Sequence, residues 1–196
     1  MKLTSKFMNV VEGHVNRVFA LKFDPLNPYL IYSGAWDCYI LANDLRERKK
    51  VGDILGPYVC GESIDISKDG KQLLAGSYQN ENYLGVYDLR TFTKLHGIQW
   101  ASTTGSSGFV YAAKYWPQKN SASTIISGST IGKDIRVFEE QNGVEFAEVN
   151  SITHLHGGPL TIDVDPKGQM MAFGTQEGEL VLYNADGFNR KPEEEL

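Results

Sequence analysis

Apolar and polar positions follow the same order of events four times along this chain. A strand-like run first ends at a turn rich in Pro, Asp or Gly; these turns follow Phe23, Ile66, Tyr115 and Val164. A second apolar run closes around a glycine, at Ser33-Gly34-Ala35, Ala75-Gly76-Ser77, Ser127-Gly128-Ser129 and Phe173-Gly174-Thr175. A third run ends in a bulky or polar residue followed by an acid or amide, at Asn43-Asp44, Tyr87-Asp88, Phe138-Glu139 and Tyr183-Asn184. The pattern predicts four repeats built of β-strands and short turns.

The spacing of these repeats predicts an all-β propeller with four blades of four strands each. The residues that end the third runs lie 44, 51 and 45 residues apart, close to the period of about 40–45 residues of a four-stranded blade. One sheet cannot bury both of its faces, so such blades must stack on one another. The small residues around each glycine allow neighbouring blades to approach closely.

The residues of the first repeat resemble those of the WD-repeat family. Gly13-His14 stands before the first strand, Ser33-Gly34-Ala35 closes the second, Asp37 lies in the next turn, and Asn43-Asp44 ends the third. In that family a His, a Ser or Thr, an Asp and a Trp form a buried hydrogen-bonded tetrad. The resemblance implies that His14, Ser33 and Asp37 form a partial network of this kind, because Asn43 replaces the Trp.

The other repeats match more loosely, but together the four cover nearly the whole chain, from about residue 7 to residue 184. Glu177 and Tyr183 occupy the turn-acid and Trp positions of the last repeat. We expect a propeller over residues 1–186, with blades at about 13–55, 56–95, 96–150 and 154–186. Residues 1–12 would form a closing outer strand, and residues 187–196 a polar acidic tail.

Three arrangements of the four blades remain open. They form a small ring closed by the amino terminus, a partial propeller completed by another chain or a second copy, or the carboxy-terminal part of a larger propeller. An unpaired blade would expose a sheet face and strand edges, which soluble proteins avoid. We therefore favour dependence on a partner or on further sequence.

Composition argues against several classes of ligand. The net charge of −5 disfavours nucleic acid, and no apolar run approaches the length of about 20 residues that spans a bilayer. Cys38 and Cys60 are predicted to be free thiols in a reducing compartment, which favours a cytoplasmic location. His154 and His156 are interpreted as part of a turn rather than metal ligands, so we expect no metal and no cofactor.

The sequence contains no nucleophile elbow and no phosphate-binding loop. We therefore predict no catalytic residues, and an enzyme with an unrecognised site stays the less favoured alternative. The predicted function is a protein–protein interaction scaffold, either an adaptor or a structural subunit of a larger complex, such as a cytoskeletal, ciliary or trafficking complex.

Binding residues are expected on the loops at the end of the propeller where the innermost strands begin. The candidates for partner binding are Asn16, Arg17, Trp36, Tyr58, Glu62, Tyr78, Thr130 and Gln176. Trp36 and Tyr78 are the strongest, because exposed aromatic side chains are frequent among interface hot spots. The alternative for Trp36 is that it packs over the neighbouring blade.

A more specific alternative comes from two arginines. Asp44-Leu45-Arg46 and Asp88-Leu89-Arg90 resemble the Trp-Asp-x-Arg box of propellers that serve as substrate receptors of cullin-type ubiquitin ligases. In that case Arg46 and Arg90 would contact the ligase adaptor from the opposite face. An arginine at this place also commonly forms a simple ion pair at the rim of the sheet.

Overall fold

The computed structural model describes residues 13–79, 83–100, 109–117, 124–143 and 145–184. Every regular element in these ranges is a β-strand, and the strands form four antiparallel sheets that follow one another in sequence. The predicted all-β class is thereby confirmed. We number the sheets blades 1 to 4.

In each blade the strands pair in the order in which they occur along the chain. Blade 1 contains β1 (Val18–Phe23), β2 (Leu30–Ala35), β3 (Tyr39–Asp44) and β4 (Lys49–Leu55). Blade 2 contains β5 (Ile64–Ile66), β6 (Gln72–Gly76), β7 (Leu84–Asp88) and β8 (Thr93–Ile98). Blade 3 contains β9 (Val110–Tyr115), β10 (Thr124–Ser129), β11 (Asp134–Gln141) and β12 (Glu145–Ile152), and blade 4 contains β13 (Pro159–Val164), β14 (Met170–Thr175) and β15 (Leu180–Asn184).

One detail differs from the predicted blades. Strand β8 continues to Ile98, past the predicted end of blade 2 at residue 95. Blade 4 has three strands among the described residues, and its fourth, outermost strand was expected to come from residues 1–12. The closing strand expected at residues 1–12 and the tail at 187–196 lie outside the described residues.

In blades 1 and 4 the turn between the first two strands is held by short polar side chains. Asp24 Oδ1 accepts the backbone N–H groups of Leu26 and Asn27 at 2.8 and 2.9 Å. Asp165 does the same for three later residues of the turn in blade 4, and these backbone donors lower its pKa. Gly168 follows with a φ of +67°, which glycine adopts without steric cost. The chain therefore reverses where the sequence places Asp, Pro and Gly.

The core of the molecule consists of three apolar layers, one between each pair of consecutive blades. The layer between blades 1 and 2 contains Tyr32, Ile40, Ile64 and Leu73. The second and third layers have the same make-up, with Leu84 and Ile125 in one and Ile135 and Phe173 in the other. The sheets are thus held together by stacking face to face, as the repeat predicted.

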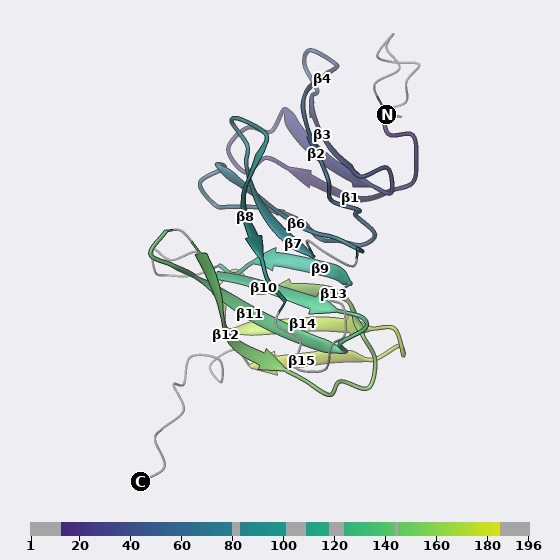
Figure 1. Ribbon diagram of the computed structural model, residues 1–196, viewed down its shortest axis with the longest axis vertical. Helices are drawn as coiled ribbons and strands as arrows, with labels where there is room; N and C mark the ends of the chain where they lie inside the picture. Colours follow the sequence, from purple (N-terminus) through teal and green to yellow (C-terminus); the bar gives the residue numbers. More distant parts are fainter. Residues whose placement is uncertain (1–12, 80–82, 101–108, 118–123, 144, 185–196) are drawn as a thin grey trace.

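The innermost strands lie next to one another in chain order: β1 contacts β5, β5 contacts β9, and β9 contacts β13. Figure 1 shows the result as a series of blades along the long axis of the molecule, with blade 1 at one end and blade 4 at the other. The described blades therefore form an open arc with two ends.

Candidate protein-interaction face

One end of the blades, at which β1, β5, β9 and β13 begin, gathers the predicted binding residues; we call it the entry face. A repeated backbone hydrogen bond places four of them. The N–H groups of Trp36, Thr130 and Gln176 each donate to the carbonyl of the residue directly before the innermost strand, at 3.0, 3.1 and 3.0 Å. The Tyr78 N–H donates to the carbonyl of Tyr58, in the loop that leads to β5, at 2.9 Å. Equivalent loops of the four blades are thereby held at the same level of the face.

Bulges in the innermost strands bring further side chains to this face. The strand register shifts between Val18 and Ala20 in blade 1, opposite Ser129 in blade 3 and between Pro159 and Thr161 in blade 4. The extra residues are Phe19, Tyr111 and Leu160. A bulge re-aims the side chain that it carries, so these residues do not follow the simple in–out alternation of a strand.

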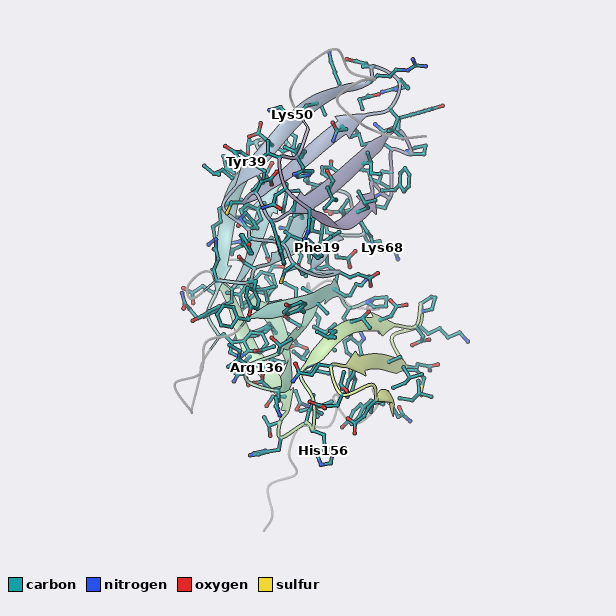
Figure 2. All side chains as sticks on the ribbon, turned by 90° about the vertical axis from the view of Figure 1, so that its right-hand side faces the viewer. Phe19, Tyr39, Lys50, Lys68, Arg136 and His156 are labelled. Atoms are coloured by element: carbon teal, nitrogen blue, oxygen red, sulfur yellow. The ribbon has the colours of Figure 1, made fainter. Side chains whose placement is uncertain are left out.

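Trp36 stacks between two aromatic rings from consecutive blades. The Phe19 ring lies with its centroid 4.7 Å from that of Trp36, and the Tyr58 ring of blade 2 stacks at 5.9 Å with an interplanar angle of 13°. Figure 2 labels Phe19 on blade 1. The indole ring is half-buried, and its buried Nε1 has no hydrogen-bond partner among the described residues. Trp36 therefore packs over the neighbouring blade while part of its surface stays open to solvent.

Tyr78 forms the corresponding aromatic contact between blade 2 and blade 3. Its ring centroid is 4.1 Å from that of Phe109 and 5.4 Å from that of Tyr111. Burial raises the pKa of Tyr111 to about 12, while Tyr78 is 37% exposed. From blade 3 to blade 4 the aromatic series ends, because Thr130 lies directly against Gly158.

Polar side chains surround these aromatic steps. The Arg17 guanidinium lies 5.4 Å from the centroid of the Trp36 ring, a distance that permits a cation–π interaction. Asn16 Oδ1 accepts the Arg17 N–H at 2.8 Å, and its amide group donates to the Trp36 carbonyl at 3.5 Å. Glu62 accepts a hydrogen bond from Thr161 Oγ1 at 3.2 Å, which joins blade 2 to blade 4 near the centre of the arc.

The entry face is thus an aromatic series with a polar rim. Phe19, Phe109 and Tyr111 belong to it although the sequence analysis did not select them. The signal that identifies Phe19 and Tyr111 is a bulge, which is read from the strand register and not from a single sequence. Phe109 is identified by its ring contact with Tyr78.

His14, Ser33 and Asp37 are joined by hydrogen bonds at the edge of the entry face. The two ring nitrogens of His14 lie 2.9 Å from Asp37 Oδ2 and 2.8 Å from Ser33 Oγ. The His14 and Asp37 side chains are 6% and 5% exposed. With both nitrogens engaged and little solvent contact, His14 holds the first loop in place and is poorly placed to act as a base.

The two arginines of the adaptor-box alternative lie at the other end of the strands. Arg46 donates to Asp44 Oδ2 at 2.9 Å and lies 4.7 Å from the Tyr29 ring centroid. The Asp44–Arg46 hydrogen bond lowers the pKa of that carboxyl to about 2. Arg90 is exposed, and its backbone N–H donates to Asp88 at 2.7 Å.

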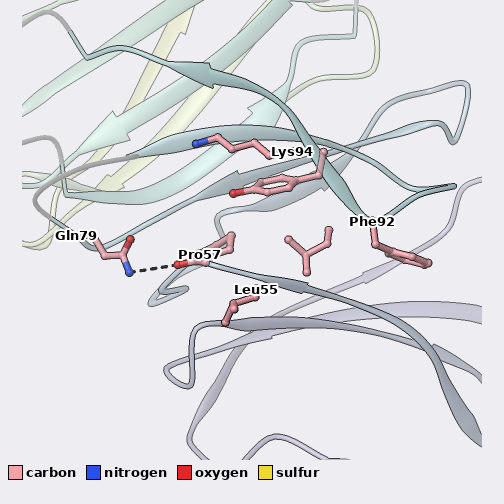
Figure 3. A pocket seen from close by; sticks show the side chains of 8 residues that line it. Leu55, Pro57, Gln79, Phe92 and Lys94 are labelled. Atoms are coloured by element: carbon pink, nitrogen blue, oxygen red, sulfur yellow. Dashed lines mark hydrogen bonds between the residues drawn. The ribbon is translucent and has the colours of Figure 1, made fainter.

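A cavity of about 370 Å³ lies between the outer parts of blades 1 and 2. Its wall combines the apolar side chains of Leu55, Pro57 and Phe92 with the polar side chains of Lys94 and Gln79 (Figure 3). Gln79 donates to the Gly56 carbonyl at 3.2 Å, and burial lowers the pKa of Lys94. The sequence analysis did not foresee this cavity, since its wall comes from loops and strands of two blades.

Within the described residues no three His, Cys, Asp or Glu side chains gather as a metal site. His156 is 89% exposed beside Glu179. Arg136 in blade 3 is buried; it pairs with Asp134 and Glu148 at 2.9 Å each and lies over the Trp100 ring. Burial raises the pKa of Asp134. This cluster lies within the sheet and serves packing. No described helix is long and apolar enough to cross a membrane.

Comparisons with known proteins agree with this geometry. The family model described as "WD domain, G-beta repeat" matches residues 5–41. WD repeat-containing protein 82 of Drosophila melanogaster is 23% identical over 186 residues, which cover 95% of this chain and 56% of that protein. The chain therefore spans about half the length of this curated relative.

Among solved structures, the crystal structure of the computationally designed Ika4 protein is similar in fold. It superimposes with a TM-score of 0.66 at 18% identity, over 89% of this chain and 95% of that chain. This similarity, together with the four stacked sheets, confirms the propeller fold predicted from the repeat.

Proposed function

We propose that this chain, a WD-repeat β-propeller of four blades, is a non-catalytic scaffold that binds partner proteins through its entry face. WD repeats in general support protein interaction. The observation that carries the proposal is the aromatic series that crosses from Trp36 and Tyr58 to Tyr78 and Phe109. Aromatic side chains supply most of the binding free energy at many interfaces, particularly where a polar rim surrounds them.

Tyr78 is the residue we expect to contribute most to partner binding. Its ring is held by Phe109 and Tyr111, so little conformational entropy is lost on binding, and over a third of its surface is available. Trp36 contributes a smaller exposed surface and more packing. Exposed Arg17 beside the Trp36 ring and exposed Glu62 near the centre of the arc supply opposite charges, which favours a partner with polar groups around an apolar centre.

The test compares capture of partners by tagged wild-type chain and by Tyr78→Ala, with quantitative mass spectrometry. Truncation of a hot-spot aromatic costs about 1–2 kcal/mol or more, so capture should fall about tenfold or more. Tyr29→Ala is the matched control, because this tyrosine is 48% exposed and precedes β2 at the opposite end of the blade. Circular dichroism verifies that both variants fold.

Equal capture by Tyr78→Ala and wild type would rule out the entry face. Loss in Tyr29→Ala alone would move the binding site to the opposite face, where Arg46 lies. Stoichiometry separates the two kinds of scaffold, because an adaptor exchanges partners while a structural subunit co-purifies at a fixed ratio. We place this role in a reducing compartment such as the cytoplasm, since Cys38 and Cys60 are free thiols.

A further inference from the structure

The third strand of every blade carries two apolar positions that the following blade buries. The first is the residue that pairs with the glycine near the end of the second strand, and the second lies two positions later along the third strand. In blades 1 to 3 these residues are Ile40 and Ala42, Leu84 and Val86, and Ile135 and Val137, all at most 4% exposed. In blade 4 they are Leu180 and Leu182, which are 76% and 69% exposed. We call this surface of a blade its back.

We call the opposite surface of a blade its front. On the front it is blade 1, and not blade 4, that leaves apolar positions exposed. Equivalent positions on the innermost strands of blades 2, 3 and 4 are Ile64, Ala113 and Ile162, which are 3%, 0% and 1% exposed. In blade 1 the same position is Leu21, at 64%, and the next front position, Phe23, is 56% exposed. Ile31 and Leu41 on the same front are buried, so the exposed part is the innermost strand.

Each of the three apolar layers joins the back of one blade to the front of the next. The back of blade 4 and the front of blade 1 are therefore not covered by another described blade. They are the two kinds of surface that pack together elsewhere in the arc, but they lie at opposite ends of the molecule (Figure 1). We propose that a second copy of this chain covers both, with the back of each blade 4 on the front of the other copy's blade 1. Two copies of four blades give eight, which is within the range of about 4–8 blades found in closed propellers.

Charges on the innermost strands continue the pattern across the proposed contact. Lys22, Asp65, Lys114 and Asp163 occupy one register position in blades 1 to 4. The signs alternate, and Lys22 Nζ lies 2.7 Å from Asp65 Oδ1 across the first pair of blades. In a ring of two copies, the exposed Asp163 is followed by Lys22 of the second copy, so the alternation closes without like charges meeting.

The glycine beside these leucines also points to a missing neighbour. A Cβ atom at Gly34 or Gly128 would meet side chains of the next blade within 3.0 Å. At Gly174 its nearest contact would be Thr161 of the same blade, at 3.1 Å. Blade 4 thus keeps the feature that permits close approach of a following blade, although no blade follows it among the described residues.

The experiment measures the mass of the full chain by light scattering after gel filtration, over a series of concentrations, and by native mass spectrometry. We expect twice the chain mass of 21.8 kDa. Leu182→Glu on the back and Leu21→Glu on the front should each raise the dimer dissociation constant more than about tenfold, since either change places a charge in both contacts. Leu95→Glu is the control, because Leu95 is 41% exposed at the edge strand of blade 2.

Mixing the two variants provides a test that misfolding cannot imitate. The front of Leu182→Glu and the back of Leu21→Glu are both intact, so the mixture should recover a heterodimer through one contact. A monomer at every concentration would overturn the proposal. The back of blade 4 and the front of blade 1 would then be surfaces for blades of a different polypeptide. A dimer that survives both substitutions, or a mass that grows beyond two copies, would overturn it equally.

Discussion

Replacement of Gly128 by Ala tests how closely the blades approach each other. Gly128 lies in β10 of blade 3 and faces blade 4. A Cβ atom built there would lie 2.6 Å from Pro159 Cγ and 3.0 Å from Ile162 Cδ1. Pro159 has a rigid ring, and Ile162 is 1% exposed in the layer between the two blades. Neither side chain has room to withdraw without moving blade 4.

The expected cost follows from two opposing effects. Forcing an extra methyl group into a packed interior costs about 1–3 kcal/mol. Ala also lowers the conformational entropy of the unfolded chain, which stabilises the folded state by about 0.5–1 kcal/mol. This gain applies here since the φ of Gly128 is not positive and would not strain an Ala. The central values of the two effects, about 2 and about 0.75 kcal/mol, leave a fall of about 1.2 kcal/mol in the free energy of unfolding, which lowers the Tm by about 2–5 °C for a chain of this size.

Gly174→Ala is the matched control, since Gly174 pairs with β15 as Gly128 pairs with β11 but has no following blade in the chain. Its stability should be unchanged or higher by up to about 1 kcal/mol. Urea unfolding of dilute protein, followed by tryptophan fluorescence, measures both variants, because Trp100 and Trp116 pack in the layers on either side of blade 3.

A Gly128→Ala variant as stable as the wild type would refute the reasoning. It would mean that blade 4 can shift to make room for the methyl group and that close packing between the blades does not require glycine at this position. Equal destabilisation by Gly174→Ala in the dilute monomer would also contradict it, because the cost would then arise within the sheet and not between blades.

Two further predictions concern ionisable groups. Since Arg46 lowers the pKa of Asp44 to about 2, the stability from this pair should be present above pH 3.8 and lost as the pH falls towards 2. An NMR titration should show the low midpoint, and Arg46→Met should raise it towards the ordinary value; an unchanged midpoint would contradict the assignment. Burial raises the pKa of the Cys60 thiol to about 12, so iodoacetamide at neutral pH should label Cys38 and leave Cys60 unmodified until the protein unfolds. Peptide mass spectrometry reads both sites, and equal labelling in the folded protein would show that Cys60 is open to solvent.

Much of the local structure could be predicted from single positions. The turn at Asp165-Pro166-Lys167-Gly168 forms because Asp accepts nearby backbone N–H groups and Gly permits a positive φ. The pairing of His14 with Ser33 and Asp37 was implied by the family resemblance, and the three side chains do meet. Such features depend on residue type and spacing along one blade.

The entry face was only partly predictable. Tyr58 and Tyr78 could be selected because they lie in loops between strands. The partners that hold them, Phe109 and Tyr111, could not, since Tyr111 reaches Tyr78 through a bulge in another blade. A shift of one residue in the register reverses the side to which a strand residue points, and one sequence does not record that shift.

The number of repeats, the all-β class and the glycines at which blades approach can be read from the chain alone, because each depends on a local pattern that recurs at a fixed period. The exposure of Leu21 and Leu182 cannot be read from the chain in this way, although their equivalents in other blades are buried. All of these positions are apolar, so their residue types are alike. What differs is the presence of a neighbouring blade, which depends on the order of stacking and on where the arc ends.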